Sequence, residues 1–181
     1  MALVNYKSLE QAYDKGRMKE NVRRLKDYDV FHCLLAGDAD RANAVQKRVS
    51  GLPEDFIKWI NICDGGMLFD TALLTTKAND KELDLSFETY GDYYDSDLRK
   101  DREVADDWFI FAVAVHSDLF YFNLADNDGR VYQWDVEEHQ IYAVWDTFED
   151  WITDQINEAV ELIANEELEP LDIKLERAGD E

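Results

Sequence analysis

The stretch LPEDFIKWINICDGG, from Leu52 to Gly66, decides the expected fold. Its proline suits the first position of a helix, and the Glu-Asp pair after it faces the positive end of the helix dipole. Apolar residues then recur at steps of three and four, so one stripe of the helix faces a core; they are Leu52, Phe56, Trp59, Ile60 and Cys63. Because the pair Gly65-Gly66 follows this stripe, we expect it to end the helix and to lead into a strand that begins near Met67.

The flanking sequence predicts helices before this stretch and a sheet after it. The expected helices are a hairpin that starts at a Ser8–Gln11 capping box, a segment from Lys19 to Leu35 and a segment from Asp38 to Val49. The expected strands are residues 67–76, 108–115, 119–125, 130–136 and 140–145, and the last four form an antiparallel meander. A final helix starts at the capping pair Thr147 and Asp150 and runs to about residue 167.

These elements predict an α+β fold in which N-terminal helices and a C-terminal helix pack on one antiparallel β-sheet. At 181 residues the chain suits a single domain, residues 1–181. We divide it into a helical N-terminal extension (1–50), a core (51–167) and an acidic tail (168–181), in which Ile173 and Leu175 could add an edge strand. A long polar crossing, residues 77–107, separates the first strand from the meander and carries a possible short element from Leu83 to Phe87.

The charge of the chain restricts the class of its partners. The sequence has 41 acidic and 19 basic residues, which gives a formal net charge of −22. Such a field repels nucleic acids and anionic membranes, so we expect neither as a partner, and it attracts basic proteins. The basic residues gather in the first helical region, and the sequence leaves open whether they pair with the acidic C-terminal helix.

The two cysteines and the N-terminus bear on location. Cys33 and Cys63 both lie in apolar patterns, which favours reduced thiols in the core over a disulfide framework. The sequence shows no signal-peptide pattern and no apolar run of about 18 residues that could span a membrane. We therefore expect a cytoplasmic protein, either a monomer or a weak homo-oligomer.

Three motifs in order resemble the SUKH superfamily, which includes fungal Smi/Knr cell-wall-synthesis regulators and many bacterial relatives. They are LPEDFIKWINICDGG, then GRVYQWD from Gly129 to Asp135, and TFEDWI from Thr147 to Ile152. The resemblance covers residues 52–163. It implies helices against one antiparallel sheet and, for most bacterial members, a non-enzymatic immunity protein that neutralises a toxin, often a nuclease. A regulatory or scaffold module that binds host proteins is the alternative that the fungal relatives imply.

The candidate interface lies in the long crossing and at the start of the meander. Aromatic side chains that often anchor interfaces alternate there with carboxylates that suit a basic partner. The candidate protein-binding residues are Tyr90, Asp92, Tyr93, Tyr94, Asp95, Asp97, Asp106, Asp107 and Trp108. An ordinary acidic loop whose tyrosines cover the sheet is the alternative interpretation.

Catalytic and metal-binding patterns are weak. The histidines His32, His116 and His139 have no zinc-ligand spacing, and the segment Asp126–Gly129 fits a β-turn better than a calcium loop. The Gly65-Gly66 pair follows a predicted helix C-terminus, whereas phosphate-binding glycines precede an N-terminus. The many aspartates include no pair marked as acid and base, and no nucleophile motif is present. We therefore expect no enzyme, no cofactor and no metal site.

Overall fold

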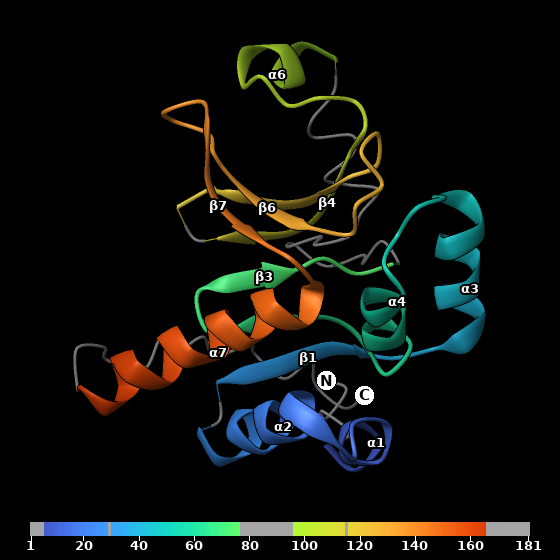
Figure 1. The fold of residues 1–181 in the computed structure, drawn as a ribbon, viewed down its shortest axis with the longest axis vertical. Coiled ribbons are helices and arrows are strands. Elements are labelled where there is room, and N and C mark those ends of the chain that lie inside the picture. The colour runs from blue at the N-terminus through green and yellow to red at the C-terminus, as the bar shows by residue number, and fades with distance from the viewer. Residues whose placement is uncertain (1–5, 29, 77–95, 115, 166–181) are drawn as a thin grey trace, which may run out of the picture.

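The fold is α+β, as the sequence predicts. A computed structural model describes residues 6–28, 30–76, 96–114 and 116–165. The helices are α1 Tyr6–Ala12, α2 Gly16–Tyr28, α3 Ala39–Arg48, α4 Glu54–Ile60, α6 Ser96–Asp101 and α7 Phe148–Ala164. The strands are β1 Phe31–Ala36, β2 Cys63–Leu68, β3 Thr71–Leu73, β4 Trp108–Ala114, β5 Leu119–Asn123, β6 Val131–Asp135 and β7 Gln140–Trp145. They form one antiparallel sheet in the order of the chain (Figure 1).

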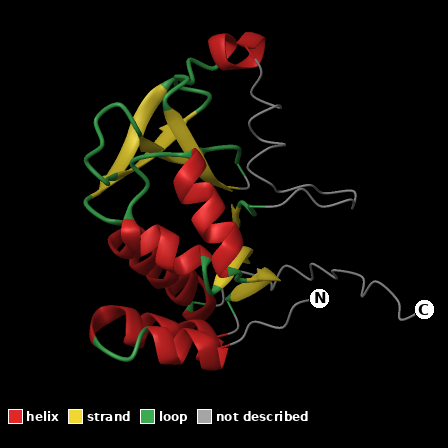
Figure 2. Cartoon of the chain, turned by 90° about the vertical axis from the view of Figure 1, so that its right-hand side faces the viewer, coloured by secondary structure: helices red, strands yellow, loops and turns green. Residues whose placement is uncertain are grey.

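An aromatic core joins one face of the sheet to two helices. Phe56 of α4 contacts Phe111 of β4, Phe122 of β5 and Phe148 of α7 at ring-centroid distances between 5.1 and 5.3 Å. The ring of Phe111 also meets that of Trp151 edge-on at 4.9 Å. Tilted and edge-to-face pairs of this kind add to the stability that burial of the rings provides. Figure 2 shows α6 at the opposite end of the molecule from α1 and α2.

The C-terminal helix begins where its capping pattern predicts. The Oγ1 atom of Thr147 accepts a hydrogen bond from the backbone N–H of Asp150 at 3.0 Å. Asp38 likewise caps α3, as predicted, by accepting from the backbone N–H groups of Asp40 and Arg41. The Ser8–Gln11 prediction is wrong, because Ser8 lies inside α1.

The opening stretch folds differently from the prediction at its end. Helix α4 ends at Ile60, and Cys63, Gly65 and Gly66 lie within β2, so the glycines do not end the helix. Gly65 has a φ of +73°, and a Cβ atom added there would collide with the Thr75 side chain. A Cβ atom at Gly66 would lie 2.5 Å from the ring of Phe31 on β1. The two glycines therefore allow β2 to lie close to its neighbours. Glycine within a strand often marks such a close approach.

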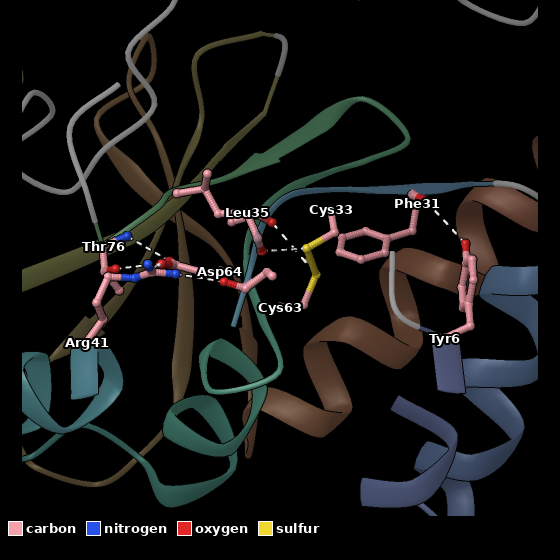
Figure 3. Close-up of a disulfide and its surroundings, with 10 residues drawn as sticks. Tyr6, Phe31, Cys33, Leu35, Arg41, Cys63, Asp64 and Thr76 are labelled. Atoms are coloured by element: carbon pink, nitrogen blue, oxygen red, sulfur yellow. Dashed lines mark hydrogen bonds and ion pairs between the residues drawn. A yellow bond between two sulfur atoms is a disulfide. The ribbon is translucent and has the colours of Figure 1, made fainter. Parts of the chain in front are cut away.

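A disulfide replaces the expected free thiols. Cys33 of β1 and Cys63 of β2 are bonded, with their Cα atoms 6.0 Å apart (Figure 3). Both residues are buried, as predicted, but the expectation that they are reduced is wrong for this structure. Because disulfides persist mainly in oxidising compartments, the cysteines no longer argue for a cytoplasmic location.

Other boundaries also differ. The segment predicted to continue the second helix to Leu35 is strand β1, and the single strand predicted from Met67 to Thr76 is the hairpin of β2 and β3. Helix α6 was not expected. The possible element from Leu83 to Phe87 and the possible edge strand in the tail lie outside the described residues.

Two basic residues of α2 contact the C-terminal helix, whereas Arg23 and Lys26 pair with Asp27 and Glu10 within the N-terminal helices. Arg17 of α2 lies 2.7 Å from Asp150 and 3.6 Å from Glu149, both in the first turn of α7. Arg24, also on α2, donates a hydrogen bond to the side chain of Asn157, which lies further along α7. These contacts attach α2 to α7, which answers the question that the sequence left open.

Candidate functional site

The predicted interface residues divide into two groups. Tyr90, Asp92, Tyr93, Tyr94 and Asp95 lie outside the described residues. Asp97 lies in α6, but its side chain is not described. The remaining three residues lie at the start of β4, where Asp106 and Asp107 are exposed and Trp108 is half-buried. The structure describes the side chains of these three predicted residues.

Trp108 begins a row of aromatic side chains that crosses three strands. Its ring stacks on that of Tyr121 of β5 with the centroids 3.9 Å apart and lies 5.1 Å from the ring of Trp134 of β6. Tyr121 in turn stacks on Tyr132 of β6 at 5.4 Å. We call Trp108, Tyr121, Tyr132 and Trp134 the aromatic row; they share a face because the register pairs Tyr121 with Tyr132 directly.

The polar ends of the aromatic row are held in place. The indole N–H of Trp134 donates to the carbonyl oxygen of Arg102 at 3.1 Å, and the hydroxyl of Tyr132 donates to Asp128 at 2.8 Å. Burial raises the pKa of Tyr121 and of Tyr132, and for Tyr132 the hydrogen bond to Asp128 raises it further. Both phenols are therefore neutral near neutral pH and fit a packing or contact role better than proton transfer.

Strand β7 extends the same face and leaves it uncovered. The register places Ile141 opposite Trp134 and Val144 opposite Tyr132, so these two side chains continue the aromatic row. Ile141 is 50% exposed, Tyr142 71% and Val144 47%. Among the described residues only two other large apolar side chains, those of Tyr28 and Ile163, are comparably exposed. Exposed apolar surface is thus concentrated on β7, as is common at protein-binding sites.

Carboxylates gather at both ends of strands β4–β7. We call them the acidic rim: Asp106, Asp107, Asp126, Asp128, Asp135, Glu137, Glu138 and Asp146. Some of this charge is paired locally, since Arg130 lies 3.9 Å from Asp128 and 3.4 Å from Asp146. The sequence prediction found only the first two members of the rim. The alternation of aromatic residues along 119–134 could have shown that the others border the same face.

A second polar cluster is structural. Asp64 of β2 is only 1% exposed and accepts hydrogen bonds from Thr76 Oγ1 at 2.6 Å, Thr76 N at 2.8 Å and Arg41 Nε at 3.1 Å (Figure 3). Arg41 also donates to the carbonyl oxygen of Ala36 at 2.7 Å, so the cluster joins α3 to β1 and β2. Because every contact serves to satisfy the buried carboxylate, Asp64 does not fit a free catalytic acid.

The described residues offer little for metal binding or membrane insertion. In this part of the chain no group of three or more His, Cys, Asp or Glu side chains is placed to hold a metal ion. The side chain of Asp128 accepts from the backbone N–H of Arg130 at 3.0 Å, which is an Asx turn, and the backbone turn of this segment lies at residues 124–127. None of the described helices has the length and apolar character needed to cross a bilayer.

Comparison with known proteins identifies the family. The model of the SMI1 / KNR4 family (SUKH-1) matches residues 38–154. This match covers more than half of the 181 residues, so the chain belongs to the SMI1 / KNR4 family. The match begins after α1, α2 and β1 and includes the aromatic row and β7. A search of curated proteins finds no match to the chain.

Proposed function

We propose that this member of the SMI1 / KNR4 family is an immunity protein, which binds a basic toxin domain such as a nuclease and neutralises it without catalysis. One observation carries the proposal: exposed apolar side chains on β7 continue an aromatic row that the acidic rim borders, on a chain with a net charge of −22. The family consists in general of non-catalytic protein-interaction and immunity-type modules, which supports the same class of function.

The charge and the aromatic row have separate roles in this proposal. A nuclease must be basic where it holds nucleic acid, so the negative field of this chain increases the rate at which the two proteins meet. The half-buried rings of Trp108 and Tyr132 and the exposed ring of Tyr142 then provide contact area with little loss of conformational entropy, as in many interface hot spots, whereas Tyr121 and Trp134 are buried and support them. An inhibitor needs both properties, because it must reach the toxin before the toxin reaches its substrate and must then stay bound to it.

A tagged pull-down from the native host tests the proposal. The retained proteins are washed at about 50 mM and then about 300 mM salt, a range over which screening of exposed charges increases strongly. We expect one basic partner in stoichiometric amount that salt loosens, and we expect co-expression of this chain to protect cells from that partner. Several non-basic partners would instead indicate the regulatory or scaffold module.

Paired variants locate the surface. The double substitution Asp106→Asn/Asp107→Asn removes two charges from the acidic rim, and Asp14→Asn/Glu20→Gln removes two charges from exposed positions of the N-terminal region. We expect the first variant to bind the partner more slowly and the second to bind it as the wild type does. Equal effects would mean that only the overall charge matters and that the rim is no specific surface.

A further inference from the structure

Strand β7 forms one edge of the sheet. It pairs with β6 on one side, and in the order of the sheet no strand follows it (Figure 1). Among the described residues, those from 140 to 145 make no backbone hydrogen bond outside the ladder with β6. The outer side of β7 therefore presents backbone N–H and C=O groups that another strand can use.

The side chains of β7 do not protect this edge. Natural edge strands usually carry charged residues or proline that prevent pairing with another chain. The sequence of β7 is QIYAVW, which has neither, and its residues Ile141, Tyr142 and Val144 are about half or more exposed. An uncharged, β-branched and aromatic strand of this kind tends to associate with other strands unless a partner covers it.

The charges at the two ends of β7 select the chemistry of that partner. Asp135 is the last residue of β6, Glu137 and Glu138 lie in the turn that leads into β7, and Asp146 follows β7 directly. Their carboxylates lie beyond both ends of an uncharged strand, so a segment that lies along β7 gains if it carries Lys or Arg near each of its own ends.

The same charges argue against pairing of β7 with the β7 strand of a second copy of this chain. If two β7 strands paired, the acidic end of one would lie against an acidic end of the other in either direction. Like charges opposite one another on paired strands are unfavourable, and the net charge of −22 adds to the repulsion.

A bulge in β7 favours a flexible segment over a preformed sheet edge. The register passes from Gln133–Ala143 to Trp134–Ile141, which leaves Tyr142 as the extra residue. A bulge bends and twists its strand, and this is a common means of preventing two rigid edges from pairing. An extended segment that is not yet part of a sheet can follow the bend.

We propose that β7 binds an extended basic segment of the partner protein, which pairs with it as a further strand of the sheet. Main-chain hydrogen bonds supply affinity in this mode, and alternate side chains supply specificity. Alternate apolar side chains of the segment contact Ile141 and Val144, and its Lys or Arg residues face the carboxylates at the ends of β7. The inference rests on the proposed function, because the partner is the same basic protein.

Two synthetic peptides test the pairing without the unknown partner. The first alternates Lys and Val over nine residues, and the second has the same sequence with alternate amide nitrogens methylated, which removes hydrogen bonds but not charge. We expect the first to protect the amides of β7 in the full chain from hydrogen exchange, and the second to bind weaker by about tenfold or more. Equal binding of the two peptides would overturn strand pairing, as would protection confined to other elements.

Matched variants locate the site. Val144→Lys places a charge on the edge, and Tyr28→Lys makes the same change at a similarly exposed apolar residue of α2. We expect the first to abolish protection of β7 by the peptide and the second to leave it unchanged. If the β7 amides that face away from β6 are already protected in the free chain, or if the chain dimerises through β7 as its concentration rises, the inference is wrong.

These outcomes can be told apart from failure of the proposed function. The peptide experiment needs neither toxin nor host, and a host pull-down that retains no basic protein would leave its result intact. Conversely, a basic partner that binds Val144→Lys as tightly as the wild type would preserve the proposed function and overturn the role of β7.

Discussion

Strands β1–β3 and strands β4–β7 belong to the same sheet, but different contacts stabilise them. In β4–β7 large aromatic side chains cover both faces, and the backbone follows regular alternation apart from two bulges. In β1–β3 the strands approach closely at Gly65 and Gly66, and a disulfide and the buried Asp64 cluster add specific links. The first half therefore depends on close contacts between few atoms, whereas the second half depends on the area that its side chains bury.

The largest expected effect comes from the aromatic half. Phe111 is fully buried among Phe56, Phe122, Phe148 and Trp151. We expect Phe111→Ala to lower the free energy of unfolding by about 3–5 kcal/mol, because it removes buried area and leaves a cavity. Urea unfolding measures the change.

A matched control for Phe111 lies on the exposed edge. Tyr142 is 71% exposed, so Tyr142→Ala should change the free energy of unfolding by no more than about 0.5 kcal/mol. A loss below about 1 kcal/mol for Phe111→Ala would mean that burial is not what stabilises this half.

The next effect concerns the disulfide of the first half. The bond closes a segment with a sequence separation of 30 residues. The chain-entropy model then predicts that Cys33→Ala/Cys63→Ala lowers the free energy of unfolding by about 3–4 kcal/mol, because the unfolded chain gains freedom. Dithiothreitol should lower the stability of the wild type and leave that of the double variant unchanged. If the wild type unfolds at the same urea concentration with and without reductant, the bond does not contribute.

A smaller effect is expected at the close approach of β1 and β2. A Cβ atom at Gly66 would lie 2.5 Å from Cε2 of Phe31 and 2.9 Å from the carbonyl oxygen of His32. We expect Gly66→Ala to lower the free energy of unfolding by about 1–3 kcal/mol through overpacking.

A double-mutant cycle separates this clash from other effects of the alanine. In a Phe31→Leu background the ring is gone, so Gly66→Ala should cost at least about 1 kcal/mol less. Gly16→Ala is the control, since an added Cβ atom there meets nothing within 4 Å, and it should show no coupling to Phe31→Leu. Equal costs of Gly66→Ala in both backgrounds would show that the ring does not set the close approach.

The same difference between the halves explains what the sequence could predict. Strands β4–β7 and helix α7 were predicted with boundaries within about three residues of the observed ones, because alternation and a capping pair mark them. Residues 31–35 are a short apolar run, and periodicity alone does not separate a buried strand from a helix in such a run. The glycines of β2 have the sequence pattern of a helix end. Their actual role depends on the close approach of Thr75 and Phe31, which the sequence does not show.

For the candidate site the sequence gives the composition but not the arrangement. Asp106, Asp107 and Trp108 were predicted as interface residues because of their type. The exposure of β7 was missed, because QIYAVW has the composition of a covered strand, and only the order of the sheet shows that it is an edge. The disulfide was missed for a similar reason, since the pairing of β1 with β2 brings its two cysteines together.

The smallest effect tests the buried carboxylate of the first half by its pH dependence. Burial raises the pKa of Asp64, while hydrogen bonds from Thr76 and the charge of Arg41 oppose the shift. The folded protein therefore holds the proton more tightly than the unfolded chain does. Asp64 contributes a share of stability that is fully present below its unfolded pKa, near 3.8, and is lost as pH rises through its folded pKa.

Comparison with Asp64→Asn isolates this share, because the other carboxylates titrate alike in both proteins. We expect the difference in unfolding free energy, wild type minus variant, to increase as pH falls from neutral to about 4. Urea unfolding of both proteins over this range measures it. A difference that decreases on acidification would mean that Arg41 and Thr76 outweigh burial. The cluster would then stabilise the first half through charge, and the close contacts of β1–β3 would depend on an ionised Asp64.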